Sequence, residues 1–259
     1  MSVGSVWLAS LPALAILAGA AWAVCTVRRN VGLVDIFWSL FFLAAAVSYA
    51  VEAAPTGPRT TLLLVLVAAW ALRLATHLAA RNWNAPEDRR YQAIRTRNQP
   101  YFEWKSLYLV FGLQGLLAWI ISAPLAAAIA SPAAFSVLDV AGALLATFGI
   151  AYEAVADAQL ARFRRDPASA GRVLDRGLWR WSRHPNYFGE ACVWWGFYVM
   201  AVAAGGAWTV FAPVLMTVLL LRVSGVTLLE RDIGERRPAY RDYVARTSAF
   251  VPWPPRSRA

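Results

Sequence analysis

Ionisable side chains occur inside the apolar segments of this sequence, where each costs about 2.5 to 3.5 kcal/mol to insert into a membrane. Asp35 lies in "GLVDIFWSL", and Glu153 and Asp157 lie one helical turn apart in "AYEAVADAQLARF". Arg73 and His77 have the same spacing in "WALRLATHLAARN". Such groups are candidates for a functional site, although a buried pair, for instance Asp35 with Arg73, could also serve only to join two helices.

A charged, hydrogen-bonding segment, "WSRHPNYFGE", precedes another apolar stretch at positions 181–190. A helix that begins there presents unpaired backbone N–H groups and the positive end of its dipole, which favour an anion. Arg164, Arg183 and His184 could donate charge-assisted hydrogen bonds to a phosphate. The alternative is that these cations only anchor the chain at anionic lipid headgroups.

Asp157 and Glu190 add a second kind of chemistry to this region. Carboxylates suit ribose hydroxyls or a carboxamide better than a phosphate, because hydroxyl and amide groups can donate hydrogen bonds to them. Together with the cations they indicate a nucleotide-like ligand. Neither GxGxxG nor GxxxxGK[ST] occurs, so we expect no Rossmann or P-loop domain.

The elements that must position these residues are membrane helices. Of 259 residues, 59% are hydrophobic and 13 are Trp, which is the composition of an integral membrane protein. Spanning helices need roughly 20 apolar residues, and seven segments qualify: 6–27, 31–51, 60–80, 107–130, 137–161, 187–204 and 206–228. We therefore expect an all-α integral membrane protein with seven transmembrane helices.

The basic residues indicate the orientation of these helices. Of the 25 Lys and Arg residues, 22 follow the first, third, fifth or seventh apolar segment, and only Arg59 lies in a loop on the other side. Lys and Arg accumulate in cytoplasmic loops, so we expect the N-terminus outside and the C-terminus in the cytoplasm, with the chemistry on the cytoplasmic side. The net charge of +10 is then explained by basic loops that contact anionic lipid headgroups, and it does not indicate binding of nucleic acid.

We expect one membrane domain, 1–259, in a monomeric protein. The apolar run ending at Ala23 is preceded by no basic residue and followed by two arginines, so we interpret it as a first helix and not as a signal peptide. Cys25 and Cys192 show no CxxC spacing, and His77 stands alone in its segment. The sequence therefore predicts no disulfide framework and no metal site.

Three segments carry a resemblance to a known family: "DAQLARFRRDP", "LDRGLWRWSRHPNYFGEACVWWGFY" and "LLERDIGERRPAYRDYVARTSAFVPWPP". They resemble the C-terminal region of the steroid 5α-reductase superfamily, in particular its bacterial membrane branch formerly of unknown function. The match is specific over 150–255 and weaker over 31–119, through "VGLVDIFW", "WALRLATHLAARN", "EDRRY" and "LQGLLAW". The resemblance implies a seven-helix protein of the bacterial inner membrane that binds NADPH on the cytoplasmic side and reduces the C=C bond of a 3-oxo-Δ4 steroid.

The resemblance also implies which residues bind the cofactor. The family has a cofactor-binding Asp and Arg at Asp157 and Arg164, and an Asn and Glu at Asn186 and Glu190. The expected cofactor-binding residues are Asp157, Arg164, Arg183, His184, Asn186, Tyr187, Glu190, Arg222, Glu230, Tyr240, Arg241 and Tyr243, the last three in a tail that closes over the cofactor.

The catalytic residues of the family match this sequence less directly than its cofactor-binding residues do. The steroid enzymes use a Glu in the second helix to orient a Tyr in the third, which donates a hydrogen bond to the substrate ketone. Asp35 matches the Glu, and Arg73 is the second expected catalytic residue, but the position of the Tyr holds Trp70, whose indole N–H is a poor acid. Tyr101 and Tyr108 remain open as proton donors. The expected substrate pocket contains Trp38, Trp70, Tyr101, Tyr108 and Gln114.

The sequence therefore favours an NADPH-dependent reductase that transfers a hydride to the enone of a lipophilic steroid or isoprenoid. Two alternatives stay open. A membrane S-adenosylmethionine-dependent methyltransferase of the isoprenylcysteine or phospholipid type shares an R-H-P-x-Y-x-G turn, but Asp35 and "ERDIGERRPAYRDYVARTSAFVPW" favour the reductase. A non-enzymatic lipid carrier or scaffold is disfavoured, because many transporters show internal repeats and this sequence shows none.

Overall fold

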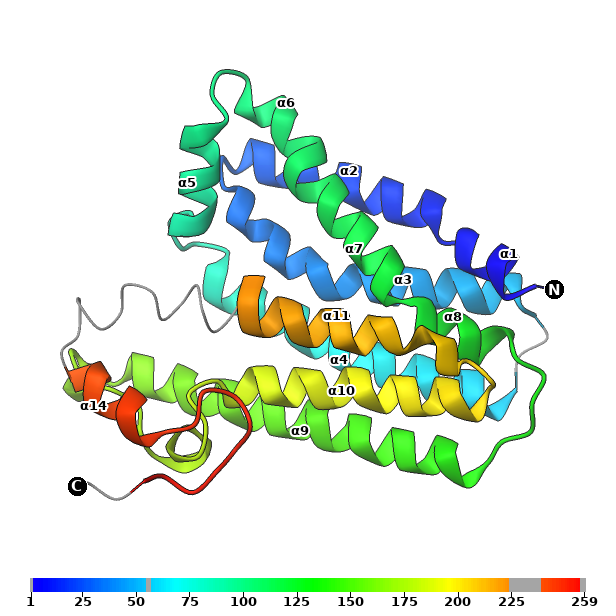
Figure 1. The fold of residues 1–259 in the computed structure, drawn as a ribbon. Helices are drawn as coiled ribbons and strands as arrows, with labels where there is room; N and C mark the ends of the chain where they lie inside the picture. Colours follow the sequence, from blue (N-terminus) through cyan, green and yellow to red (C-terminus); the bar gives the residue numbers. More distant parts are fainter. Residues whose placement is uncertain (1, 55–56, 224–238, 257–259) are drawn as a thin grey trace. The chain divides into compact units, whose positions relative to one another are not determined.

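The computed structural model describes residues 2–54, 57–223 and 239–256, and every regular element in these residues is helical (Figure 1). Five helical segments among them are long and apolar enough to cross a membrane. They are Val3–Val27, with α1 (Val3–Leu8) and α2 (Leu11–Val27); Val31–Glu52, with η1 (Val31–Leu33) and α3 (Val34–Glu52); α4 (Pro58–Asn82); Phe102–Ile121; and α9 (Val137–Arg165). An all-α, multi-pass integral membrane protein is thereby confirmed.

The last two expected spans are less apolar or shorter than the other five. α10 (Pro185–Ala203) has the length of a span, but Asn186 and Glu190 lie in its first two turns. The final apolar helix covers Ala207–Arg222 within the described residues. It contains η5 (Ala207–Val210), α11 (Phe211–Val218) and all but the last residue of the π-helical η6 (Leu219–Val223). Polar residues in α10 lower its hydrophobicity at the point where the sequence predicted a site.

The fourth expected span, 107–130, is divided into short helices. α6 (Phe102–Ser106), the π-helical η2 (Leu107–Gly112) and α7 (Leu113–Ile121) are followed at Ser122 by α8 (Ala123–Ala130). Pro124 lies in the first turn of α8, where its missing N–H costs no intrahelical hydrogen bond. Outside the apolar helices lie α5 (Arg89–Arg97), η3 (Pro167–Ser169), η4 (Gly177–Arg180) and α14 (Ala239–Arg246).

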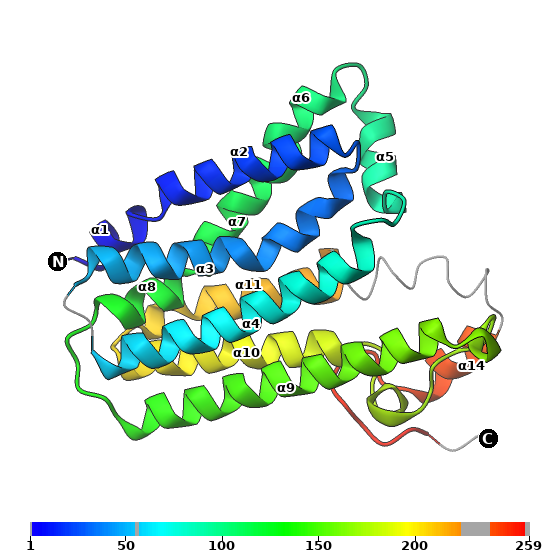
Figure 2. The ribbon, with the colours of Figure 1, turned by 180° about the vertical axis from the view of Figure 1, so that it is seen from behind.

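The chain forms two compact units. The first consists of Met1–Asp139 with Tyr198–Ala212, and the second of Val140–Phe197 with Pro213–Ala259. In the first unit, α3 lies between α2 and α4 and also contacts α1, α7 and α8 (Figure 2). Because neighbours surround it, α3 is apolar on several faces, and Phe41 is among its fully buried side chains.

A buried ion pair joins the starts of α4 and α9 in the first unit. Arg59 Nε lies 2.6 Å from an Asp139 carboxylate oxygen, and the two side chains are 5% and 0% exposed. The same guanidinium donates to the carbonyls of Ala133 and Ala134, each at 2.8 Å. Arg59, which was expected in a loop and departs from the charge asymmetry of the sequence, lies in the first turn of α4 and thus has a structural role.

The second unit is built on close contact between the backbones of α9 and α10. A Cβ atom on Gly149 would lie 2.6 Å from the Gly189 carbonyl oxygen, and one on Gly189 would lie 2.7 Å from the Glu153 nitrogen. Two turns further along α10, a Cβ on Gly196 would lie 2.6 Å from the Ala146 nitrogen. Small residues allow membrane helices to approach this closely, and the approach brings Glu153 beside the first turns of α10.

Candidate functional site

A polar cluster in the first unit joins α3, α5 and α7. Asp35, in the first turn of α3, accepts a hydrogen bond from the Tyr91 hydroxyl at 2.5 Å. The Arg90 guanidinium lies 3.2 Å from the other carboxylate oxygen, and the Gln114 amide donates to the Tyr91 oxygen at 3.3 Å. Tyr91 is only 8% exposed. We call Asp35 and Tyr91 the carboxylate–phenol pair.

The local sequence explains how α5 presents Tyr91. Asp88 caps the helix by accepting a hydrogen bond from the Arg90 backbone N–H at 2.9 Å, and its carboxylate also accepts one from Arg90 Nε at 2.9 Å. Gly32 leaves room for the phenol, because a Cβ atom there would lie 3.2 Å from Tyr91 Cδ2. A capped helix and a small neighbour together seat the ring.

The electrostatics of the cluster keep the phenol protonated. Burial, followed by the charge of Asp35 and its hydrogen bond, holds the pKa of Tyr91 well above its usual value. Burial works against the charge on Arg90, but the Asp35 carboxylate and the hydrogen bond and charge of Asp88 outweigh it and raise the pKa of Arg90. Burial of Asp88 is likewise outweighed by its bonds with Arg90, so the pKa of Asp88 is lowered. At neutral pH the cluster therefore offers a neutral phenol beside a guanidinium.

The sequence alone does not predict Tyr91 as a site residue. It lies 56 positions after Asp35, in a polar segment that the charge pattern marks only as a cytoplasmic connection. The signal that could have found it is the segment "EDRRY", in which Asp88 is a helix cap and Tyr91 is the one large apolar ring.

Of the expected catalytic and substrate residues, Asp35 and Gln114 lie in the polar cluster. Asp35 is bonded to two residues of α5, while Arg73 is partly buried on α4. Tyr101 and Tyr108 are 72% and 62% exposed, so their side chains point away from the interior.

Two further residues expected in the substrate pocket, Trp38 and Trp70, belong to an aromatic row on α3 and α4. The Phe42 ring lies between them, with its centroid 5.0 Å from Trp38 and 5.7 Å from Trp70. Trp70 is fully buried. Trp70 therefore forms part of the packing between α3 and α4.

In the second unit, the structure brings together two of the expected cofactor residues. The Asn186 amide donates to an Asp157 carboxylate oxygen at 3.2 Å. The amide oxygen of Asn186 is buried, and no residue in the described part of the chain offers it a hydrogen bond. Glu190 is 7% exposed, and His184 stacks on Tyr187 with ring centroids 5.5 Å apart.

The segment before α10 also holds the C-terminal tail. The Arg183 guanidinium donates to the carbonyls of Val244 and Thr247 at 3.0 and 2.6 Å. The buried Tyr243 hydroxyl donates to the carbonyl of Trp179, and Tyr240 packs its ring against Tyr243. Arg183 and Tyr243 thus fix the tail to the segment before α10.

Three of the remaining expected cofactor residues are exposed arginines near helix ends. Arg164 is exposed in the last turn of α9, Arg222 is exposed in η6, and Arg241 is exposed on α14. Glu230 lies outside the described residues.

Comparison with known proteins gives a family but no activity. A family model described as "Protein of unknown function (DUF1295)" matches residues 21–247. An uncharacterized protein of Schizosaccharomyces pombe is 25% identical over 273 aligned residues, which cover 92% of this chain and 77% of the yeast protein. No solved structure shows a significant match.

Proposed function

This chain belongs to the DUF1295 family of membrane proteins, and we propose that it is an NADPH-dependent reductase of the steroid 5α-reductase type. The reaction transfers a hydride to the C=C bond of an enone in a lipophilic substrate, for which a 3-oxo-Δ4 steroid is the class we favour. The observation that carries the proposal is the carboxylate–phenol pair, because a buried phenol bonded to a carboxylate at 2.5 Å is the kind of donor that an enone oxygen requires.

The residues of the second unit fit a dinucleotide. The buried Asn186 oxygen lacks a donor among the described residues, and an amide or hydroxyl of a nucleotide could supply one. Asp157 and Glu190 are both buried and suit ribose hydroxyls. Arg164, exposed at the end of α9, would meet a phosphate, and Arg183 and Tyr243 would act indirectly by holding the tail. Bound NADPH would supply the hydride.

The chain's own contribution to the reaction is to stabilise charge on the substrate oxygen. As the β-carbon of an enone accepts a hydride, negative charge gathers on the carbonyl oxygen. A hydrogen bond from Tyr91 would stabilise that charge, and such a preorganised donor contributes about 2.7 to 4 kcal/mol. Tyr91 has one hydroxyl proton, which in the free protein is donated to Asp35. On substrate binding this proton would turn from Asp35 to the carbonyl oxygen, while Arg90 stays paired with the Asp35 carboxylate. The raised pKa of Tyr91 keeps the phenol protonated for this role.

The membrane topology that we propose has seven spans, with the N-terminus outside and the C-terminus in the cytoplasm. α10 and Ala207–Arg222 would be the sixth and seventh spans, and α5 would lie on the cytoplasmic side with most of the arginines. We also propose that the protein is located in a bacterial inner membrane and that it is a monomer.

The test uses detergent-purified protein. Native mass spectrometry should detect bound NADPH, and single-turnover oxidation of NADPH should depend on an added 3-oxo-Δ4 steroid. Tyr91→Phe should retain NADPH and slow the oxidation 10²-fold or more, whereas Tyr108→Phe, which alters an exposed phenol, should react normally. Binding of S-adenosylmethionine in place of NADPH, or a normal rate in Tyr91→Phe, would refute the proposal.

A further inference from the structure

The helix that presents Tyr91 cannot fix its own position. α5 has nine residues, Arg89–Arg97, most of them polar. Isolated helices shorter than about 12 to 15 residues are marginal in water. The placement of Tyr91 against Asp35 therefore depends on contacts that fasten α5 to its neighbours.

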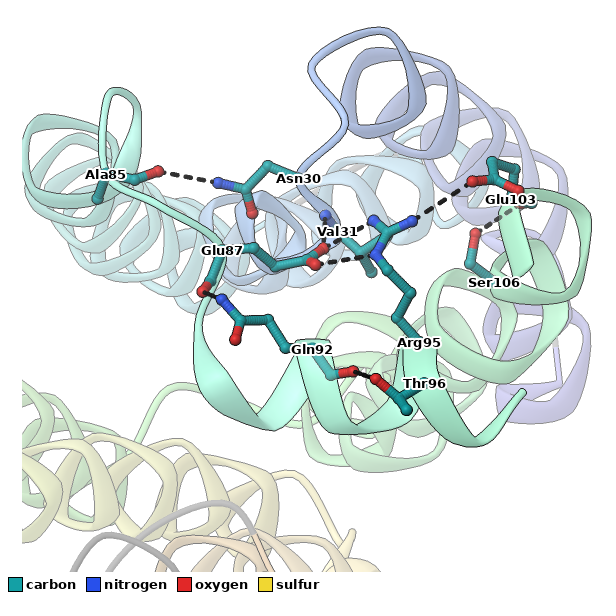
Figure 3. Close-up of polar contacts among 9 residues, drawn as sticks. All are labelled: Asn30, Val31, Ala85, Glu87, Gln92, Arg95, Thr96, Glu103 and Ser106. Atoms are coloured by element: carbon teal, nitrogen blue, oxygen red, sulfur yellow. Dashed lines mark hydrogen bonds and ion pairs between the residues drawn. The ribbon is translucent and has the colours of Figure 1, made fainter. Parts of the chain in front are cut away.

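Glu87 and Arg95, which we call the clamp, make these contacts (Figure 3). A Glu87 carboxylate oxygen accepts a hydrogen bond from the Val31 backbone N–H at 2.8 Å, and the Arg95 guanidinium donates to both carboxylate oxygens at 2.9 Å. Arg95 also lies over the Phe102 ring, 4.7 Å from its centroid, and reaches Glu103 at 3.4 Å. One ion pair thus joins the start of η1, the chain before α5 and the last turn of α5.

The clamp and the carboxylate–phenol pair share one register. Glu87 lies four residues before Tyr91, and Val31 lies four residues before Asp35, so the two interactions join segments that are both 56 residues apart. Arg95 lies four residues after Tyr91, on the same face of α5. A slip or rotation of α5 at the clamp would consequently displace the Tyr91 hydroxyl from Asp35.

We propose that Glu87 and Arg95 are positioning residues for the reaction proposed above, and that their ion pair holds the Tyr91 hydroxyl on Asp35. The chemical consequence rests on the proposed function, whereas the geometric part does not. With side chains 11% and 25% exposed, the pair is partly shielded from water, so salt screens it less than a surface pair.

The variants to compare are Glu87→Ala, Arg95→Ala and Arg95→Lys, with Thr96→Ala as the control. Thr96 lies on the same helix, and its hydroxyl donates to the Gln92 carbonyl within that helix. We expect both alanine variants at the clamp to slow single-turnover NADPH oxidation at least 10-fold while the Kd for NADPH changes less than twofold. Arg95→Lys should recover part of the rate, because it keeps the charge opposite Glu87 but not the paired hydrogen bonds.

A second measurement does not depend on catalysis. The ionisation of Tyr91 can be followed by ultraviolet absorbance in a pH titration. The absorbance of each variant is compared with that of the same variant carrying Tyr91→Phe, and the difference is the signal of Tyr91. In the intact cluster, burial and the Asp35 charge raise the pKa of Tyr91, the Asp88 charge adds to this, and Arg90 opposes it. Release of α5 should lower this pKa towards about 10, the ordinary value of a phenol, whereas Thr96→Ala should leave it unchanged.

The two measurements separate the claims. A lowered Tyr91 pKa together with a slowed reaction in the clamp variants supports the proposal, and an unmoved Tyr91 pKa in both alanine variants overturns it. If the parent protein oxidises no NADPH with any enone tested, the proposed function fails, and the titration alone then decides whether the clamp positions Tyr91.

Discussion

The buried ion pair between Arg59 and Asp139 offers a stringent test of the fold. Its side chains are 5% and 0% exposed, and the Asp139 carboxylate also accepts a hydrogen bond from the Ser136 backbone N–H at 2.8 Å. Removing one partner of such a pair leaves an uncompensated buried charge and costs about 3 to 5 kcal/mol. At roughly 2 to 4 °C per kcal/mol, Arg59→Met or Asp139→Leu should lower the melting temperature by about 10 °C.

The assay is thermal unfolding in detergent, followed by fluorescence of the 13 Trp residues. The double variant Arg59→Met/Asp139→Leu should unfold at a higher temperature than either single variant, because it removes both charges and leaves neither unpaired. Arg97→Met, which changes an exposed arginine, is the matched control and should melt like the parent. If the single variants match this control, or if their effects simply add in the double variant, the reasoning about the pair is wrong.

Three further predictions concern the site and the topology. Asp35→Asn should keep NADPH binding and slow hydride transfer about 10²-fold, since the phenol loses its charged partner; a stable variant with a normal rate would remove Asp35 from the mechanism. Arg164→Ala should weaken NADPH more than NADH in a binding titration, and equal weakening would mean that this arginine does not contact the 2′-phosphate. A reporter fused after Ala259 should be active only in its cytoplasmic form, and activity outside the cytoplasm would overturn the proposed orientation.

The sequence predicted the class of fold well because apolar length is a strong signal. It predicted the continuity of the helices less well. The segment 107–130 is apolar throughout, so composition alone gave no sign of the π-helical turn at Leu107–Gly112 or of the break at Ser122. Composition also predicts α10 and the last apolar helix as spans, although five other segments of the described chain are the ones that meet the length and hydropathy of a span.

Within the candidate site, the sequence identified groups but not always their partners. Asp35 was identifiable because an ionisable residue in an apolar span is costly, whereas Tyr91 lies in a polar segment where a tyrosine attracts no attention. The sequence therefore suggests Trp70 by alignment, and Tyr101 and Tyr108 by proximity, as the hydrogen-bond donor beside Asp35, and it does not suggest Tyr91.

The sequence does not reveal which groups Arg183 binds. An arginine beside a predicted anion site can donate to a phosphate or to a backbone carbonyl, and the residue type is the same in both cases. Its bonds to Val244 and Thr247 depend on how the tail folds back over 60 residues later. Asp157 and Asn186, in contrast, were expected in one site and lie 3.2 Å apart, because the glycines of α9 and α10 bring those helices together.

The glycine contacts between α9 and α10 bear on how sequence variation in this family should be interpreted. A methyl group at Gly149, Gly189 or Gly196 would meet backbone atoms that cannot rotate away. Natural selection would therefore hold these positions constant even in relatives with a different ligand or no catalytic activity. Gly189 directly precedes Glu190, but the two positions would be conserved for different reasons. Helix packing constrains Gly189, whereas a bound ligand would constrain Glu190, so only variation at Glu190 would indicate a change of ligand or reaction.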